Sequence, residues 1–191
     1  ALLEYTIFRL DELLGVMHFK RLKTQLDLLK ESIPIQGPKY VFIHIVSPHP
    51  PFVCNENGKY RTRMNVVNKW WEPRNEYKEQ LIYIGKRVQE FIEKIKISSD
   101  RKTIIIVQSD HGPWIQDSNP NNIYEARSKI LNAYYIPYEW NNNLYPNISP
   151  VNSFRLVFNG VFNDSLKILP DIPIDSVELF KSPLFTNMNQ K

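Results

Sequence analysis

Two short runs of β-branched and aromatic residues, separated by one long amphipathic segment, constrain this chain more than any other feature. Residues 40–46 read Y-V-F-I-H-I-V and residues 103–107 read T-I-I-I-V. Such runs are typical of strands that are buried on both faces of a sheet. Between them, residues 75–97 space their apolar side chains mostly by three and four, which predicts a helix. Strand, helix and strand in this order predict a βαβ unit of parallel strands with a right-handed crossover.

Further helices and a third strand are predicted on either side of this unit. Apolar spacing over residues 2–31 predicts a helical lead-in that Gly15 can divide in two. Residues 116–125 are polar and rich in asparagine, which predicts a loop, and residues 130–136 predict a third strand. Ser149, followed by proline, is a good start for another helix. The expected class is therefore α/β, with a mostly parallel central sheet flanked by helices.

The composition bounds the number of domains and the kinds of partner. The chain has 191 residues, of which 42% are hydrophobic and 23% charged, so one sizeable core and a single domain over 1–191 are expected. The net charge is +4 and acids interrupt the basic residues, so no nucleic-acid arm is predicted. No apolar stretch approaches the roughly 18 residues of a membrane span. The chain opens on A-L-L-E-Y without methionine, and we expect it to be part of a longer protein.

The single cysteine, Cys54, excludes an internal disulfide framework. It follows a buried-looking Phe-Val pair, which favours an inert thiol over a nucleophile. The sequence also lacks a G-x-S-x-G elbow, a phosphate-binding P-loop and an H-E-x-x-H motif. The chain therefore lacks the motifs of nucleophile-elbow serine hydrolases, P-loop nucleotide-binding proteins and H-E-x-x-H metalloproteases.

Residues that bind metals or anions follow both predicted strands of the βαβ unit. His49 lies in the loop after the first strand, and Asp110, His111 and Gly112 follow the second. Because the carboxyl ends of parallel strands share one edge of a sheet, these loops are expected to converge. A carboxylate and a neutral imidazole suit zinc or manganese. Gly112 would allow the chain to turn and would keep the floor of the site open to a ligand.

A structural interpretation competes with each functional one at this stage. The segment Asp110–Gly112 could be a tight turn with a solvated acid. His44 lies inside an apolar run and could be a hydrogen-bonded core histidine, and His18 is expected at the surface or in the core. The Trp70–Trp71 pair is expected to pack against the domain or to cover the site.

Four segments taken in order resemble one known superfamily. They are F-I-H-I-V-S-P-H-P-P-F-V, S-D-H-G, A-R-S-K-I-L-N-A-Y-Y-I-P and Y-P-N-I-S-P-V-N-S-F-R-L-V-F-N. Over roughly residues 38–170 the chain resembles the alkaline phosphatase/sulfatase superfamily. The nearer branch is that of the sulfatase-like hydrolases and transferases, which includes lipoteichoic acid synthases and phosphoethanolamine transferases. The ordered set favours a site over a simple turn at Asp110–Gly112.

The resemblance implies an α/β fold, a metal site and a mechanism. A divalent metal, zinc or manganese with calcium or magnesium as alternatives, would be held in part by Asp110 and His111. His49 matches a histidine that contacts the transferred anionic group, and His44 matches a less certain upstream histidine. The implied reaction is a two-step displacement in which the metal activates a nucleophile and neutralises phosphoryl or sulfuryl charge. His49 would stabilise the anion or protonate the leaving oxygen.

The chain also departs from the pattern of the superfamily. The first acidic ligand and the nucleophile belong to a portion upstream of these segments, and no threonine here follows a strand suitably; the candidates are Thr6, Thr24, Thr62, Thr103 and Thr186. The resemblance therefore implies the carboxy-terminal part of a sulfatase-like catalytic domain. Residues 1–38 would be a helical lead-in, 39–170 the metal-motif core and 171–191 an irregular tail. Such a chain holds half a site, and we expect it to be inactive alone.

Three functional hypotheses follow. The first is part of a metal-dependent hydrolase or transferase that acts on sulfate or phosphate esters of cell-envelope lipids or glycans. Its parent protein would lie at the extracytoplasmic face of a bacterial membrane, anchored by segments absent from this chain, with its oligomeric state open. The second is a non-catalytic sulfatase-like scaffold or binding domain. The third is a βαβ domain of other function, in which Asp110–Gly112 is only a turn.

Overall fold

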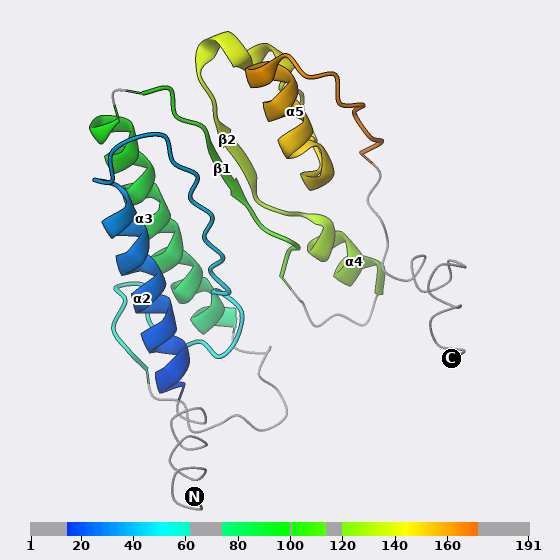
Figure 1. Ribbon diagram of the computed structural model, residues 1–191. Coiled ribbons are helices and arrows are strands. Elements are labelled where there is room, and N and C mark those ends of the chain that lie inside the picture. Colours follow the sequence, from blue (N-terminus) through cyan, green and yellow to red (C-terminus); the bar gives the residue numbers. More distant parts are fainter. Residues whose placement is uncertain (1–14, 62–73, 100, 114–119, 172–191) are drawn as a thin grey trace, which may run out of the picture. The chain divides into compact units, whose positions relative to one another are not determined.

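The computed structural model describes residues 15–61, 74–99, 101–113 and 120–171 (Figure 1). The chain divides into two compact units, Ala1–Arg101 and Lys102–Lys191, and each is described by itself. The first holds helices α2 (Val16–Ser32) and α3 (Arg74–Ser98). The second holds β1 (Ile105–Gln108), α4 (Pro120–Ser128), β2 (Asn132–Tyr135), the 3₁₀ helix η1 (Tyr138–Asn143) and α5 (Pro150–Phe162).

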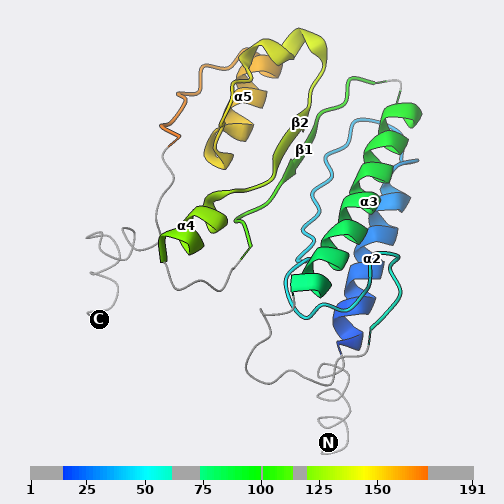
Figure 2. The ribbon, with the colours of Figure 1, turned by 180° about the vertical axis from the view of Figure 1, so that it is seen from behind.

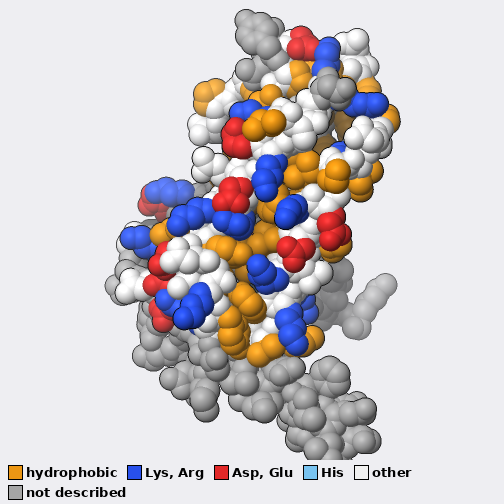
Figure 3. Space-filling view, turned by 90° about the vertical axis from the view of Figure 1, so that its left-hand side faces the viewer, with side chains coloured by type: hydrophobic (Ala, Val, Ile, Leu, Met, Phe, Trp, Pro, Cys, Tyr) orange, Lys and Arg blue, Asp and Glu red, His pale blue; other side chains and the backbone are white. Residues whose placement is uncertain are grey.

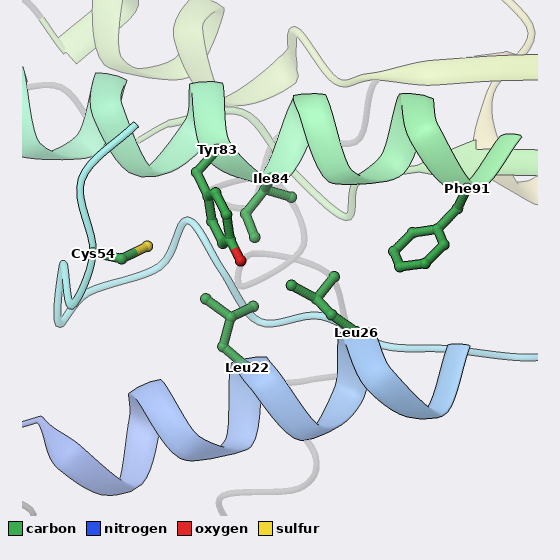
Figure 4. Close-up of a cluster of buried hydrophobic side chains, with 6 residues drawn as sticks. All are labelled: Leu22, Leu26, Cys54, Tyr83, Ile84 and Phe91. Atoms are coloured by element: carbon green, nitrogen blue, oxygen red, sulfur yellow. The ribbon is translucent and has the colours of Figure 1, made fainter. Parts of the chain in front are cut away.

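In the first unit, α2 and α3 lie side by side and enclose a small apolar core (Figures 1 and 4). Side chains from both helices and from the connecting loop meet there; they are Leu22, Leu26, Cys54, Tyr83, Ile84 and Phe91. Leu22 and Leu26 are four residues apart, so both project from one face of α2 toward α3. The amphipathic spacing predicted for 75–97 is thus confirmed by α3 and by its buried face.

The ends of α2 follow from the residues that flank it. Gly15 precedes the helix with a φ of 74°, a left-handed conformation that glycine adopts without a Cβ penalty. At the other end, the Lys39 ammonium donates hydrogen bonds to three main-chain oxygens, those of Ser32, Ile33 and Ile35, at 2.7–3.0 Å. The last carbonyls of a helix lack intrahelical partners, and a lysine there also complements the helix dipole. Gly15 therefore starts α2, and the part of the lead-in before it lies outside the described residues.

In the second unit, β1 and β2 form a two-stranded antiparallel sheet, in which Ile105 pairs with Tyr135 and Gln108 with Asn132. Helix α5 lies beside β2 in both views of Figures 1 and 2. The hydroxyl groups of Tyr134 and Ser153 join the two elements at 2.7 Å. The predicted strands at 103–107 and 130–136 are confirmed in kind. β1 begins two residues later and ends one residue later than expected, and β2 lacks two expected residues at its start and one at its end.

Two asparagines on α5 hold the segment that follows the helix. Asn152 donates to Leu169 O at 2.8 Å and accepts from Leu169 N at 2.9 Å. Asn159 makes the same pair of bonds to Leu166 O and N, at 2.9 and 2.8 Å. Each carboxamide thus imitates the main chain of a neighbouring strand. Because the two asparagines are seven residues apart, they lie on the same face of the helix.

The predicted βαβ unit is wrong within the described residues. Residues 40–46 form no strand, and most of their apolar side chains are exposed, with Tyr40 at 75% and Phe42 at 77%, while Ile45 packs partly buried against the core. The partner of β1 is β2, and the pairing is antiparallel rather than parallel. A hydrophobic run indicates that its side chains suit a buried strand, but it does not identify the segment whose backbone pairs with it. His44 is consequently exposed and is not the core histidine that the run favoured.

Two further expectations concern loops. The polar stretch predicted as a loop over 116–125 contributes to α4 from Pro120 onward, because proline at the first turn and helix-compatible residues after it outweigh the asparagine content. The sequence Asn57-Gly58 is typical of a turn, and the chain turns there, with Gly58 at a φ of 76° between the bridged residues Cys54 and Tyr60. The Trp70–Trp71 pair lies outside the described residues.

Surface properties add two observations. On the face in Figure 3, lysine and arginine side chains alternate with acids and with exposed hydrophobic side chains. None of the helices described here is long and apolar enough to span a bilayer. The α/β class stands, as a helical unit and a unit with a small sheet flanked by helices.

The asparagine pairs predict unequal costs for two matched substitutions. Asn152 is fully buried, and its side chain also contacts Asp171 Oδ1 at 2.9 Å, whereas the bonds of Asn159 are exposed. Asn152→Ala leaves partly buried main-chain groups of Leu169 unsatisfied and is expected to lower the free energy of unfolding by about 2–3 kcal/mol. Asn159→Ala, the control, is expected to cost about 1 kcal/mol or less because water replaces the lost bonds. Urea denaturation followed by circular dichroism measures both, and equal losses would contradict this account.

Candidate functional site

The four residues S-D-H-G, directly after β1, divide into two anchors and two exposed side chains. Ser109 N donates to Leu131 O at 2.9 Å, and Leu131 N donates to Ser109 Oγ at 2.9 Å. Ser109 therefore extends the pairing of the β1–β2 sheet by one position with its own side chain as acceptor. The chain leaves the sheet after this residue, so Asp110 is the first position at which a side chain is free of the strand alternation.

Gly112 is the second anchor, and it requires the absence of a side chain. Its N–H donates to Arg127 O at 2.7 Å, which satisfies one of the orphan carbonyls at the end of α4. A Cβ at this position would lie 1.9 Å from Ala126 O and 2.7 Å from Lys129 O. The expectation that Gly112 keeps the floor open to a ligand is wrong, because the carbonyl end of α4 occupies that space. Glycine is needed here for close packing.

Between the anchors, Asp110 and His111 present their side chains to solvent, at 82% and 43% exposure. His111 N donates to Asp110 Oδ1 at 2.9 Å, which orients the carboxylate. His111 Nδ1 lies 2.8 Å from Gly112 O. A carbonyl oxygen only accepts, so Nδ1 carries the hydrogen and Nε2 of the neutral ring keeps its lone pair.

This pair fits a divalent cation. Asp110 Oδ2 and His111 Nε2 are 3.6 Å apart. Two ligands bound about 2.0–2.2 Å from a shared zinc ion are separated by ~3–3.5 Å in tetrahedral geometry. The bond from Nδ1 to a main-chain carbonyl is the arrangement that fixes the tautomer of metal-binding histidines. Within the described ranges, however, no group of three or more such ligands comes together, so the pair supplies part of a coordination shell.

His49 lies in the first unit, at a pocket of about 220 Å³ between α2 and the S-P-H-P-P loop. Its Nδ1 lies 2.6 Å from Pro50 O, so Nδ1 carries the hydrogen of the neutral ring and the lone pair is on Nε2. The loop turns back on itself through a hydrogen bond from His49 N to Val46 O at 2.9 Å. His44 does not line this pocket. Its main-chain oxygen accepts a hydrogen bond from Gln25 Nε2 at 2.5 Å, and its side chain is exposed.

Sequence reasoning missed the contribution of α2 to this pocket. His18, Arg21 and Gln25 line it, and they share one helix face at spacings of three and four. The spacing was visible in the sequence. Nothing in the pattern indicated that this face would lie against the loop bearing His49, so His18 was expected to be an ordinary surface or core residue.

Cys54, also in the first unit, is inert, as the sequence favoured. The residue is fully buried, and burial raises the pKa of its thiol to about 11, an effect that the nearby Arg61 only partly opposes. Nucleophilic attack requires the thiolate, which is scarce at neutral pH when the pKa is so high. Cys54 therefore belongs to the core of the first unit.

The predicted site residues thus fall in both units. Asp110 and His111 are adjacent and oriented together, His49 lines its own pocket, and His44 lies apart from that pocket. The convergence of the His49 loop with the Asp110–His111 pair stays a prediction, since each unit is described by itself.

Comparison with known proteins gives one match. The family model described as Sulfatase matches residues 19–144, more than half of the chain, and the matched stretch includes both loops. Neither the curated proteins nor the solved structures yielded a significant match.

Gly112 yields a prediction with an internal control. Gly112→Ala drives a methyl group into the carbonyls that end α4 and is expected to lower the free energy of unfolding by about 1–3 kcal/mol or more. Gly85 lies inside α3, where an added Cβ meets nothing within 4 Å. Gly85→Ala is expected to raise stability by ~0.5–1 kcal/mol, because alanine is the better helix former. Thermal denaturation measures both changes, and a neutral Gly112→Ala would contradict the packing role.

The buried Cys54 thiol yields a second prediction, which concerns its reactivity. In the folded chain at pH 8 it is expected to resist Ellman's reagent, and after denaturation it should react at the rate of a free thiol. Because the pKa is about 11 in the folded state against an ordinary 9.0, the folded state binds the proton more tightly. The contribution to stability is complete below pH 9 and is lost as the pH rises toward 11. Rapid modification of the native chain at pH 8 would contradict the assigned burial.

Proposed function

Because this chain belongs to the sulfatase family, we propose that Asp110 and His111 hold a divalent cation in a hydrolase or transferase of sulfate or phosphate esters. Sulfatase-like hydrolysis is the activity of this family, and its members generally use a divalent metal. The observation that carries the proposal is the orientation of the pair. Nε2 of His111 keeps its lone pair, and it lies 3.6 Å from a carboxylate oxygen of Asp110. We propose zinc or manganese, since both accept mixed oxygen and nitrogen ligands.

Each residue has a distinct task in this proposal. Bound at Asp110 and His111, the cation would supply Lewis-acid neutralisation of the charge on the sulfuryl or phosphoryl group. Gly112 and Ser109 position the pair by fixing the main chain on either side of it. His49 would contact the transferred group through Nε2 while its Nδ1–H stays on Pro50 O, and only the imidazolium form, which carries a second proton on Nε2, would give that proton to the leaving oxygen. His44 is a second candidate for contact with the substrate, with its main chain held by Gln25.

The substrate and the location are proposals supported by the sequence resemblance. The esters would belong to lipids or glycans of the cell envelope, and the parent protein would work at the extracytoplasmic face of a bacterial membrane. Sulfate and phosphate esters need similar cationic contacts, so the choice between them belongs to surface loops.

A second candidate function is favoured by the small number of metal-binding side chains that the described residues bring together. The described residues bring together two ligands, whereas catalytic metal sites commonly have three protein ligands and an open position. A sulfatase-like scaffold that keeps the fold for binding needs no more than this. The two candidates differ in whether the complete domain holds a metal and turns over an ester.

Metal titration of the 191-residue chain tests the proposed ligands. We expect weak binding of Mn²⁺, seen as selective paramagnetic broadening of the Asp110 and His111 signals in NMR spectra. Asp110→Asn and His111→Gln should each weaken binding at least about tenfold, the lower bound for disturbing even an outer-shell partner. Aryl sulfate and phosphodiester substrates should show no turnover with this chain.

The matched control is His44→Gln, which removes an exposed imidazole that is not one of the proposed ligands. It should leave the broadening of the Asp110 and His111 signals unchanged. Broadening centred elsewhere, or full stoichiometric loading that survives Asp110→Asn, would overturn the assignment of the ligands. Turnover by this chain that depends on His49 would contradict its expected inactivity.

A further inference from the structure

Residues 40–46 of the first unit, called here the apolar run, have the sequence of a strand but no strand beside them in the described structure. They follow α2 as an extended trace that runs beside the two helices of the unit in both views (Figures 1 and 2). Tyr40 and Phe42 are 75% and 77% exposed, whereas Ile45 packs against the core. Because successive side chains of an extended chain point to opposite faces, one face of the run lies on the helices and the other is open.

The main chain of the apolar run has one occupied edge and one open edge. His44 O accepts a hydrogen bond from Gln25 Nε2 on α2 at 2.5 Å. Neighbouring residues of an extended chain direct their N–H and C=O groups to opposite edges, so those of Val41, Ile43 and Ile45 share the other edge. Within the described part of the chain, these three residues make no main-chain hydrogen bond. Such an edge is a template for pairing with another strand.

The open edge and the open face together restrict the kind of partner. A bilayer offers no partners to main-chain N–H and C=O groups, so lipid does not satisfy the edge. A helix has already used its own main-chain groups within its turns. The apolar run contains no formally charged residue, so it selects neither an acidic nor a basic partner. What remains is the extended, uncharged main chain of another strand.

The same run of a second copy fits these requirements by symmetry. When two copies lie antiparallel with Ile43 opposite Ile43, the opposed pairs are Tyr40–Val46, Val41–Ile45, Phe42–His44 and their mirror images. Each position keeps its face, and aromatic side chains stand opposite β-branched ones or an imidazole, as favourable cross-strand pairs do. Lys39, the charge next to the run, falls opposite Ser47, and its ammonium is held at the end of α2. No like charges therefore oppose each other.

We propose that the apolar run pairs with the same run of a second copy of this chain, as two antiparallel strands centred on Ile43. The open edges of both copies then face each other, and Val41, Ile43 and Ile45 exchange main-chain hydrogen bonds across the two-fold axis. One pair of short strands is a small contact beside the roughly 1,200–2,000 Å² of stable interfaces, so the dimer is weak. This inference goes beyond the proposed function and needs neither metal nor ester, so each can fail without the other.

The first test is hydrogen exchange of main-chain amides in the 191-residue chain, followed by NMR at about 20 µM and about 1 mM protein. At the higher concentration, the amides of Val41, Ile43 and Ile45 should exchange several-fold more slowly. Those of Phe42 and His44 are the internal control and should keep their rates, because they lie on the opposite edge. Protection that is equal at odd and even positions, or absent from the run, would overturn the proposal.

The second test is the monomer–dimer equilibrium measured by sedimentation. Phe42→Lys places one charge on the open face of each copy, diagonally across the strand pair, and should weaken dimerisation at least about tenfold. Leu28→Lys is the matched control, since Leu28 is 59% exposed on α2, lies outside the run and gains the same charge. It should leave the dissociation constant within about twofold.

A third variant addresses the main chain alone. Val41→Pro removes one N–H from the open edge and should also weaken dimerisation at least about tenfold, with circular dichroism to check that its helices form. If this variant does not fold, Phe42→Lys still decides the question. Dimers that persist in Phe42→Lys, or equal losses in Leu28→Lys, would show that another surface or a general charge effect is responsible. A chain that stays monomeric at about 1 mM would equally contradict the proposal.

Discussion

The hydrogen bond from Gly112 to the carbonyl end of α4 sets the position of everything at the candidate metal site. It forms at an approach that leaves no room for a side chain. Ser109 is paired to Leu131 on the other side, so the main chain of Asp110 and His111 is held at both ends. Their exposure is therefore imposed by their neighbours. The main chain therefore presents a carboxylate and an imidazole together, which is what the proposed metal site requires.

In the first unit too a loop is held in place, but here side chains of the two helices hold it. Its loop contains three prolines within residues 47–51 and so can make few main-chain hydrogen bonds of its own. Two glutamine side chains, Gln25 and Gln80, provide the missing contacts from α2 and α3. Gln25 precedes the core residue Leu26 in α2, and Gln80 binds the main chain of the core residue Cys54. The packing of α2 against α3 consequently also shapes the pocket.

Helices and strands with a clear hydrophobic spacing were predictable from the sequence, but the segments that pair or pack with them were not. The amphipathic spacing gave α3 and the cap residues gave the start of α5, since both signals are local. Residues 40–46 carried an equally strong strand pattern, yet pairing depends on a backbone distant in sequence. The residue types of Asp110–Gly112 indicated a ligand pair, but the reason for the glycine lay in α4, which was predicted as loop. Arg21 was missed because a helix period fixes a face and not what that face meets.

The asparagine contacts of α5 have a consequence for how this region can evolve. Asn152 and Asn159 bind main-chain atoms of Leu169 and Leu166, and no contact of this kind depends on the identity of the leucine side chains. The segment can therefore accumulate substitutions while it remains attached. A single inserted or deleted residue between the two anchor points has a different effect, because it moves the main chain out of step with the helix. Tolerance of sequence drift and intolerance of length change are thus built into the same stretch.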